Sequence, residues 1–550
     1  MGKRVYNIVF HTHTISGIII SAALYVIFFT GSISFLRDEI SAWERNEPIS
    51  ADYFRTVDFD KALHVLSEDR DLYGRDISFS NRYFERRMAS SMTASKDTTM
   101  KAPPEQGRRE NFFYMDMDTF EKRDYTANYS LGEFFYRLHF FAQLNFFGRS
   151  GYFLSGLVAF FFLFSVITGV VVHWKKIIQS FYVFRPGAKW KTIWTDAHVA
   201  LGMIGLPYQF MFALTGCYLM IGYMFMLPPV EALVYDGDAE KLQKAMRYEA
   251  VDDYPFEADK LERTVPIGQF IDSTLKKYPD VALNQLQIFN YGDTGMHVKV
   301  SGSPRYSDKL LGTGHLTFRA SDGMLADEKN PYQKTGYVEG ASDTMRRLHY
   351  GDFGGYGMKL IYLVLGFVTC FVILSGVLIW LVARKNKTVS RSKQRFNEWL
   401  VHVYLAVCLS LYPITAIAFI AVKLFADTVE TSPKTFLYQV FFWGWLVFSV
   451  FFIFKRNNRF TNMTNLFLGG ILGFFVPISN GIVTGNWPWI SWSKGYSQIF
   501  VVDVFWIVLS LTAFAILLKL KANAKNKEGT TLQKKKPLRP KKQVEAGVPL

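Results

Sequence analysis

The stretch YFLSGLVAFFFLFSVITGVVVHW (152–174) decides the fold class of this chain. It contains no charged residue, and about 20 mostly apolar residues are enough for a helix to cross the hydrocarbon core of a bilayer. Seven more runs of comparable length lie at roughly 13–35, 197–226, 358–382, 399–424, 437–454, 463–484 and 499–519. The sequence therefore predicts an all-α polytopic membrane protein with about eight transmembrane helices.

The charge pattern fixes an expected orientation. Of the 550 residues, half are hydrophobic and 20% are charged, with a net charge of +15. Lys and Arg gather before the first apolar run and after the second, fourth, sixth and eighth runs. The positive-inside rule places these alternate loops, and both termini, in the cytoplasm. A nucleic-acid partner is not expected, because the basic clusters flank membrane ends and are not interleaved with aromatic residues.

Two long polar segments, 37–137 and 227–348, then lie outside the cytoplasm. Each holds a strand-turn-strand pattern near its end, at 112–124 and 316–328, which is typical of a β-hairpin. We expect a small α+β domain in each segment. The expected order is transmembrane helix 1 (1–36), the first outer domain (37–137), helices 2 and 3 with a basic cytoplasmic loop (138–226), the second outer domain (227–348), helix 4 (349–385), helices 5–8 (396–520) and a basic, disordered cytoplasmic tail (521–550).

Two short motifs occur twice among the first four helices. An Arg-Leu-His triplet precedes the second and the fourth helix, ending at His139 and His349. A His-x-x-x-Gly motif lies in the first helix, at His13 and Gly17, and in the third, at His198 and Gly202. All four helices then end in a small residue followed by glycine: Thr30-Gly31, Thr168-Gly169, Thr215-Gly216 and Ser375-Gly376. The first four helices are therefore expected to form two parallel helical-hairpin repeats.

Parallel repeats are related by a pseudo-twofold axis along the membrane normal, and such an axis makes equivalent residues face each other. It predicts that His13 faces His198 near the cytoplasmic side and that His139 faces His349 near the outer side. Two imidazoles facing each other between helices suit a bis-histidine b-type haem. The sequence thus predicts two haem b groups, and the absence of a C-x-x-C-H motif excludes covalent attachment.

Other residues are expected to serve these two sites. Gly17 and Gly202 lie one turn from a ligand on the same helix face and would clear room for the porphyrin. Arg137, Arg346 and Arg347 could bind haem propionates, since Arg pairs with carboxylates in bidentate fashion. His173 leaves an alternative open, because its repeat counterpart is Trp380. His173 either replaces one member of the inner pair, binds a propionate or relays a proton.

Simpler interpretations apply to several histidines. The Arg-Leu-His triplets could be interfacial anchors, and His402 is expected to be structural. His64, His297 and His315 are expected to be surface or strand residues of the outer domains.

The stretches GVVVHWKKIIQSFYVFRPGAKWKTIWTDAHVALG (169–202) and LHYGDFGGYGMKLIYLVLG (348–366), with the His-x-x-x-Gly helices, resemble the PepSY-associated transmembrane helix family. The resemblance covers about residues 1–385 and implies that the outer segments are PepSY-like domains. It also implies a ferric-siderophore reductase with two haems in a bacterial cytoplasmic (inner) membrane. This chain carries no flavodoxin-like or NADPH-binding domain, so a separate electron donor is expected: a flavoprotein, reduced flavin or quinol.

The first functional hypothesis is therefore transmembrane electron transfer to a ferric siderophore or another ferric chelate outside. It needs no catalytic acid or base, and we assign none. The second hypothesis is a haem-free permease for an iron chelate, with the histidines forming a proton relay. A third is a binding or assembly module in the outer domains with a membrane anchor, which would leave the paired histidines unexplained.

Overall fold

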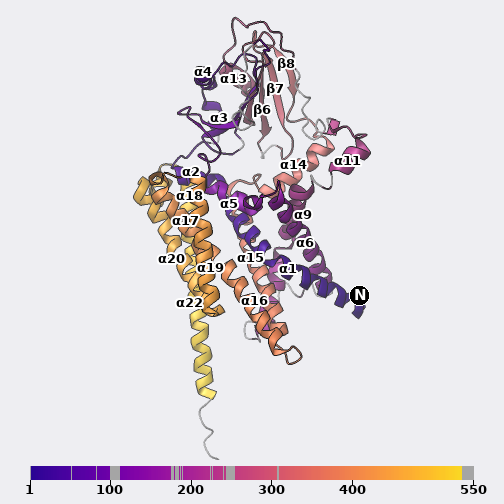
Figure 1. Cartoon of the computed structure of the whole chain (residues 1–550), viewed down its shortest axis with the longest axis vertical. Helices are drawn as coiled ribbons and strands as arrows, with labels where there is room; N and C mark the ends of the chain where they lie inside the picture. The colour runs from indigo at the N-terminus through magenta and orange to yellow at the C-terminus, as the bar shows by residue number, and fades with distance from the viewer. Residues whose placement is uncertain are drawn as a thin grey trace, which may run out of the picture.

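The computed structural model describes residues 2–534 except 51, 82, 100–111, 175–178, 180–184, 186, 187, 189, 223, 224, 226, 240, 243–253 and 306–308. A helical bundle forms one end of the molecule and a β-sheet forms the other (Figure 1). The start of the described chain and the far end of the last helix lie away from the sheet. We call the two ends of the bundle the sheet side and the opposite side.

Seven helices in the described residues are long and apolar enough to cross a membrane, and a bent pair makes an eighth span. Their elements are α1 (Lys3–Ser34), α6 (Ser150–His173), α8 (Trp190–Ile204) with α9 (Leu206–Cys217), α15 (Gly355–Arg384), α16 (Arg391–Leu409) with α17 (Leu411–Phe425), α18 (Pro433–Tyr438) with α19 (Gly444–Lys455), α20 (Asn458–Thr484) and α22 (Ser497–Lys534). These spans confirm the prediction of a polytopic membrane protein.

The third predicted span is broken. The axes of α8 and α9 differ by 69°, and the break falls at Gly205, just before Pro207. Proline lacks the amide hydrogen for a helical bond and its ring clashes with the preceding turn, so the helix ends there and restarts. The last span also differs from its prediction, because α22 continues to Lys534 through much of the tail expected to be disordered; residues 535–550 lie outside the described part of the chain.

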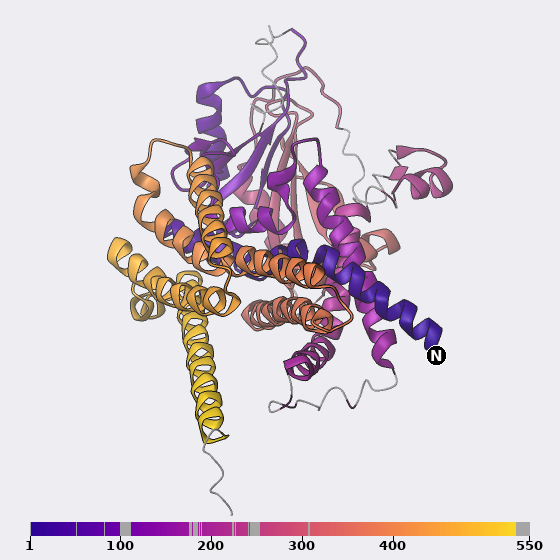
Figure 2. The same cartoon turned by 60° about the horizontal axis from the view of Figure 1, so that its bottom comes forward.

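The helices form two groups. In the first, α1 packs against α6 and α15, α9 packs against α6, and α8 packs against α15. In the second, α17 packs against α20, and α20 packs against α22. Figure 2 shows the second group, in orange and yellow, beside the first. The second group also contacts α2 (Arg37–Arg45), where the buried Asp503 accepts a hydrogen bond from the indole N–H of Trp43 at 2.8 Å.

The outer segments each contribute a helix and four antiparallel strands. The first has α4 (Phe59–Asp69) and strands β1 (Ile77–Ser80), β2 (Arg87–Met92), β3 (Phe112–Asp116) and β4 (Lys122–Arg123). The second has α13 (Ile267–Lys277) and strands β5 (Val281–Phe289), β6 (His297–Pro304), β7 (Gly314–Arg319) and β8 (Leu325–Lys329). Both predicted hairpins are confirmed, as β3 with β4 and β7 with β8.

The two segments do not form separate domains, which corrects the prediction. Their strands make one sheet in the order β4-β3-β2-β1-β5-β6-β7-β8, joined where β1 pairs antiparallel with β5. Residues of both segments share one apolar core, including Phe59 of α4 and Phe270 of α13. An unpaired strand edge exposes backbone hydrogen-bonding groups, and pairing β1 with β5 removes one such edge from each half.

Two helices connect the sheet to the bundle. These are α5 (Leu131–His139), which precedes α6, and α14 (Tyr337–Tyr350), which precedes α15. Each ends at a predicted haem ligand or one residue beyond it. The remaining short α-helices of the described residues are α3 (Tyr53–Thr56), α11 (Leu227–Val234) and α21 (Pro488–Ser493).

Candidate functional site

The structure brings together the histidines of the predicted outer pair. His139, at the end of α5, and His349, near the end of α14, have ring centres 5.9 Å apart. An imidazole nitrogen binds a first-row metal at about 2.0–2.1 Å, so two imidazoles on opposite sides of one ion have ring centres about 6.2 Å apart. The outer pair therefore has the spacing of two ligands that share one metal ion.

The inner pair has a similar spacing on the opposite side of the bundle. His13 of α1 and His198 of α8 have ring centres 6.5 Å apart, with ring planes at 70°. His173 lies at the end of α6, one turn after Gly169, and Gly169 contacts the ring of His13. Three imidazoles thus gather at the inner site, and the alternative ligand that His173 represents stays open.

All four paired rings are held by a hydrogen bond at Nδ1. The partners are the carbonyl oxygens of Ser165 for His13, Val372 for His198 and Ile27 for His139, at 2.8–2.9 Å. For His349 the partner is the hydroxyl oxygen of Thr215, also at 2.8 Å. That hydroxyl donates its own hydrogen to the carbonyl of Met211, so it accepts from the imidazole.

These hydrogen bonds decide which ring nitrogen of each histidine is available to bind a metal ion. A carbonyl oxygen accepts a hydrogen, so Nδ1 carries the proton in each ring and Nε2 keeps its lone pair. Metal-ligating histidines usually donate their second ring N–H to such an oxygen, which fixes the tautomer and the ring orientation. Each paired ring therefore keeps an unprotonated Nε2, which is the ring nitrogen that could bind a metal ion.

The small-residue-glycine pairs lie beside the same four rings. Gly169 and Gly376 contact His13 and His198, and a Cβ built on either glycine would lie 3.2 Å from the ring carbon Cε1. A Cβ built on Gly31 would lie closer still to its histidine, 2.5 Å from Nδ1 of His139. Thr215 contacts the fourth ring through its hydrogen bond with His349. From the sequence alone, these small-residue-glycine pairs are only signs of a repeat. Their contacts with the histidine rings are visible only in the structure.

Gly17 and Gly202 face open space. Among the described residues, no atom outside their own helix lies within 4 Å of the position that a Cβ would take at either glycine. Among these residues, too, no group of three or more His, Cys, Asp or Glu side chains is placed to hold a metal ion. A pair of imidazoles would suit a group such as haem, because its iron would need only two ligands from the protein, and the room beside Gly17 and Gly202 agrees with that fit.

The three predicted propionate ligands all contact carboxylates of the chain. Arg137 pairs with Glu133 through Nε at 2.6 Å, Arg346 pairs with Asp343 at 2.9 Å, and Arg347 pairs with Asp352 at 3.1 Å. Arg346 is the most exposed of the three, with 42% of its side chain accessible. The arginines lie on the two helices that carry the outer pair, as expected, but each is already in an ion pair.

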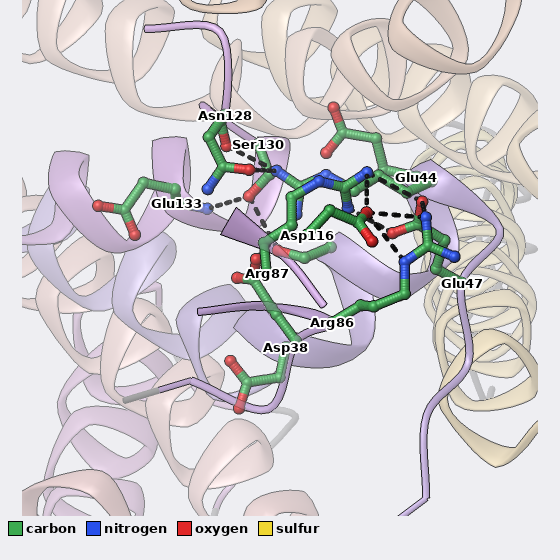
Figure 3. Close-up of polar contacts among 12 residues, drawn as sticks. Asp38, Glu44, Glu47, Arg86, Arg87, Asp116, Asn128, Ser130 and Glu133 are labelled. Atoms are coloured by element: carbon green, nitrogen blue, oxygen red, sulfur yellow. Dashed lines mark hydrogen bonds and ion pairs between the residues drawn. The ribbon is translucent and has the colours of Figure 1, made fainter. Parts of the chain in front are cut away.

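A buried charged network near α5 was missed by sequence reasoning. Arg37, at the start of α2, binds Glu85 at 2.8 Å and Glu133 at 2.8 Å, and its side chain is 10% exposed. Burial alone would raise the pKa of Glu133, but Arg37 and Arg137 outweigh burial and hold that pKa below its usual value. Figure 3 shows the continuation of the network to the sheet, where Glu47 contacts Arg86 and Arg87. The partners are separated by up to 96 residues, so no local sequence pattern predicts them.

The second helix group supports α5 from its other face. Phe134 and Phe135 of α5 are fully buried. Phe134 contacts Phe441 at 4.9 Å between ring centres, and Phe135 stacks on Phe419 of α17 at 6.0 Å. His139 is therefore positioned by the charged network and by this aromatic contact together.

A family model that describes a PepSY-associated TM region matches residues 10–383. This match covers more than half of the chain. The protein belongs to the PepSY-associated transmembrane family. A comparison with curated proteins found no match.

In this family member, both histidine pairs fall inside the matched region, whereas α16–α22 follow it. His402, in α16, uses both ring nitrogens: Nδ1 contacts Asn458 at 2.6 Å and Nε2 donates to the carbonyl of Phe452 at 2.8 Å. It has no ring nitrogen left for a metal, which agrees with the predicted structural role.

Of the histidines in the outer segments, His64 pairs with Glu68, and His315 contacts Asp327 at 2.7 Å. His297 stacks on Tyr254. All three lie in the sheet region of the protein, as expected.

Proposed function

We propose that this protein carries electrons across a bacterial cytoplasmic membrane and reduces a ferric chelate, such as a ferric siderophore, on the sheet side. The observation that supports the proposal most strongly is the presence of two histidine pairs, each spaced for one metal ion. His13 and His198 would hold one haem b, with His173 as the alternative ligand, and His139 and His349 would hold the other. Haem, when bound, supplies one-electron redox chemistry.

The two pairs lie at different depths. The ring of His139 contacts the carbonyl of Ile27, which is 14 residues after His13 on the same helix. A rise of 1.5 Å per residue makes this separation about 21 Å along α1. Two centres at opposite leaflets suit the transfer of an electron across the bilayer in two steps.

The topology supports the same direction of transfer. Basic residues lie at the ends of α15 and α19 on the side opposite the sheet: Arg384 and Lys455 are the last residues of these helices, and Lys385 and Arg456 follow them. The positive-inside rule predicts that this side is cytoplasmic. A separate donor, a flavoprotein, reduced flavin or quinol, would then deliver electrons at the inner pair, and the ferric chelate would accept them outside.

One observation favours the alternative of a haem-free permease with a histidine proton relay. The 69° break between α8 and α9 resembles the discontinuous helices that form transporter sites. A permease, however, would not explain why all four rings are held by hydrogen bonds at Nδ1 and why the ring centres of each pair have the spacing of two ligands of one metal ion.

Absorbance spectroscopy separates the two proposals. We expect the purified protein to show a b-type spectrum that sharpens on reduction with dithionite and corresponds to two haems per chain. His139→Ala or His349→Ala should remove one haem and leave the other. His64→Ala, which changes an exposed histidine of α4 (74% of the side chain accessible), is the matched control and should keep both. A colourless wild-type protein would overturn electron transfer in favour of the permease.

A further inference from the structure

Two tyrosines lie directly beside the outer histidine pair. Tyr136 precedes His139 by one helical turn in α5, and Tyr350 follows His349 at the end of α14. Their hydroxyl oxygens are 3.4 Å apart in an exposed position. We call these two residues the tyrosine pair. Since α5 and α14 connect the bundle to the sheet (Figure 1), the tyrosine pair lies between these two parts of the molecule.

The tyrosine pair rests on the charged network. The ring of Tyr83, from the β1–β2 connection, meets that of Tyr136 edge-on at 6.2 Å. The guanidinium of Arg37 lies 3.4 Å from the centre of the Tyr83 ring, and Arg37 is itself bound to Glu85 and Glu133. The sheet and the bundle therefore hold Tyr136 in place together.

The two histidine rings also contact membrane helices. His139 lies against α1 at Ile27 and Gly31. His349 lies against α9, where Phe212 is 5.1 Å away between ring centres and Thr215 binds Nδ1. On the sheet side, the same two helices present the tyrosine pair, and Tyr350 is 38% exposed.

We propose that the tyrosine pair is the contact surface for the ferric chelate, an inference that rests on the proposed function. The oxygen atoms that bind Fe(III) in hydroxamate, catecholate and carboxylate chelates accept hydrogen bonds, and a tyrosine hydroxyl would exchange its long contact with the other hydroxyl, at 3.4 Å, for a hydrogen bond to such an oxygen. The aromatic rings offer apolar area for the body of the chelate. Arg346, four residues before Tyr350 on the same face of α14, adds a charged donor.

The reaction at this surface transfers one electron and breaks no covalent bond. Fe(III) in the chelate becomes Fe(II), and the electron comes from the separate donor by way of the protein. No proton needs to move. The tyrosine pair thus acts by holding the chelate close to the outer histidines, and its effect should appear in binding even when no reduction takes place.

Gallium(III) chelates test this directly, because Ga(III) resembles Fe(III) in charge and size but is not reduced. We would titrate gallium(III) desferrioxamine B and gallium(III) citrate into the purified haem-loaded protein by calorimetry. Tyr136→Phe and Tyr350→Phe should each weaken binding of the preferred probe by about fivefold, the effect of one lost hydrogen bond. Tyr350→Ala, which also removes the ring, should weaken it further.

The matched control is Tyr337→Phe. Tyr337 begins the same helix α14 and is 90% exposed, but 13 residues of helix place it about 20 Å from Tyr350. Its replacement should leave binding unchanged, and every variant should keep two haems and the wild-type ferrous spectrum.

The possible failures are distinguishable. A wild-type protein without haem would overturn the proposed function. Two haems in all variants, with no saturable binding of either probe or with unchanged affinity in both Phe variants, would overturn the tyrosine pair alone. Another candidate surface is a polar pocket of about 310 Å³ that includes Lys334 beside β7 and β8. Weaker binding only in Lys334→Ala would move the chelate there.

Discussion

Gly31→Ala should selectively damage the outer histidine site. A Cβ at this position would lie 2.5 Å from Nδ1 and 2.6 Å from Cε1 of His139, whereas ordinary contacts begin at 3.4 Å. The ring must therefore retreat by roughly 0.9 Å, since close-packed interiors rarely absorb an added methyl without displacement. That movement opposes the hydrogen bond from Nδ1 to the carbonyl of Ile27.

The loss of such a supporting contact typically lowers metal affinity by about 10–100-fold, or about 1.4–2.8 kcal/mol. We expect purified Gly31→Ala to lose most of the outer haem and to keep the inner one. Haem titration of the apoprotein, followed by absorbance, measures both affinities.

Two further glycine variants sharpen this test. Gly169→Ala would place its Cβ 3.2 Å from His13, so the inner site should weaken only slightly. Gly357→Ala meets no described atom within 4 Å in α15 and should change neither site. Wild-type outer affinity and spectrum in Gly31→Ala would refute the claim that this glycine positions His139.

Four other outcomes follow from the structure. Gly17→Ala should lower the haem occupancy of the inner site without lowering the thermal stability of the apoprotein, because the added methyl group contacts no described protein atom. A variant that loses haem occupancy and thermal stability to the same degree would contradict this. Thr215→Val should shift the reduction potential of the outer haem, measured by redox titration, while Thr14→Val, on the exposed face of α1, should not. Glu133→Gln should destabilise the fold by about 3 kcal/mol, because it leaves the buried Arg37 with one carboxylate fewer; chemical denaturation measures it. Burial raises the pKa of Glu44 to about 7; since the folded pKa exceeds the unfolded one, stability should fall as the pH rises from about 4.5 to 7, and Glu44→Gln should flatten that part of a melting-temperature profile.

The membrane helices were predictable from local composition alone. Each needs only a run of apolar residues long enough to cross the bilayer, and the eight runs correspond to the spans of the structure. The facing histidines were also predictable, because a duplicated motif implies an axis and an axis implies which residues meet. His13 with His198 and His139 with His349 both follow from this reasoning.

The shared sheet was not predictable in the same way. The two hairpins are local features, but the pairing of β1 with β5 joins Phe79 to Leu286 across more than 200 residues. Either strand could have remained the edge of a separate domain. The charged network around Arg37 was unpredictable for the same reason, since its carboxylate partners come from α5 and from the β1–β2 connection.

The antiparallel pairing of β1 with β5 has a consequence for how the amino-acid sequence of the two halves can change. A two-fold axis between identical subunits produces the same isologous contact, and every substitution in such a dimer appears on both sides. Here one polypeptide supplies both sides, so each half can change by itself. The two helices that follow the outer segments differ in this way, because α6 ends in His173 whereas α15 carries Trp380 near its end. A covalent link between the halves thus allows differences between them that a homodimer could not encode.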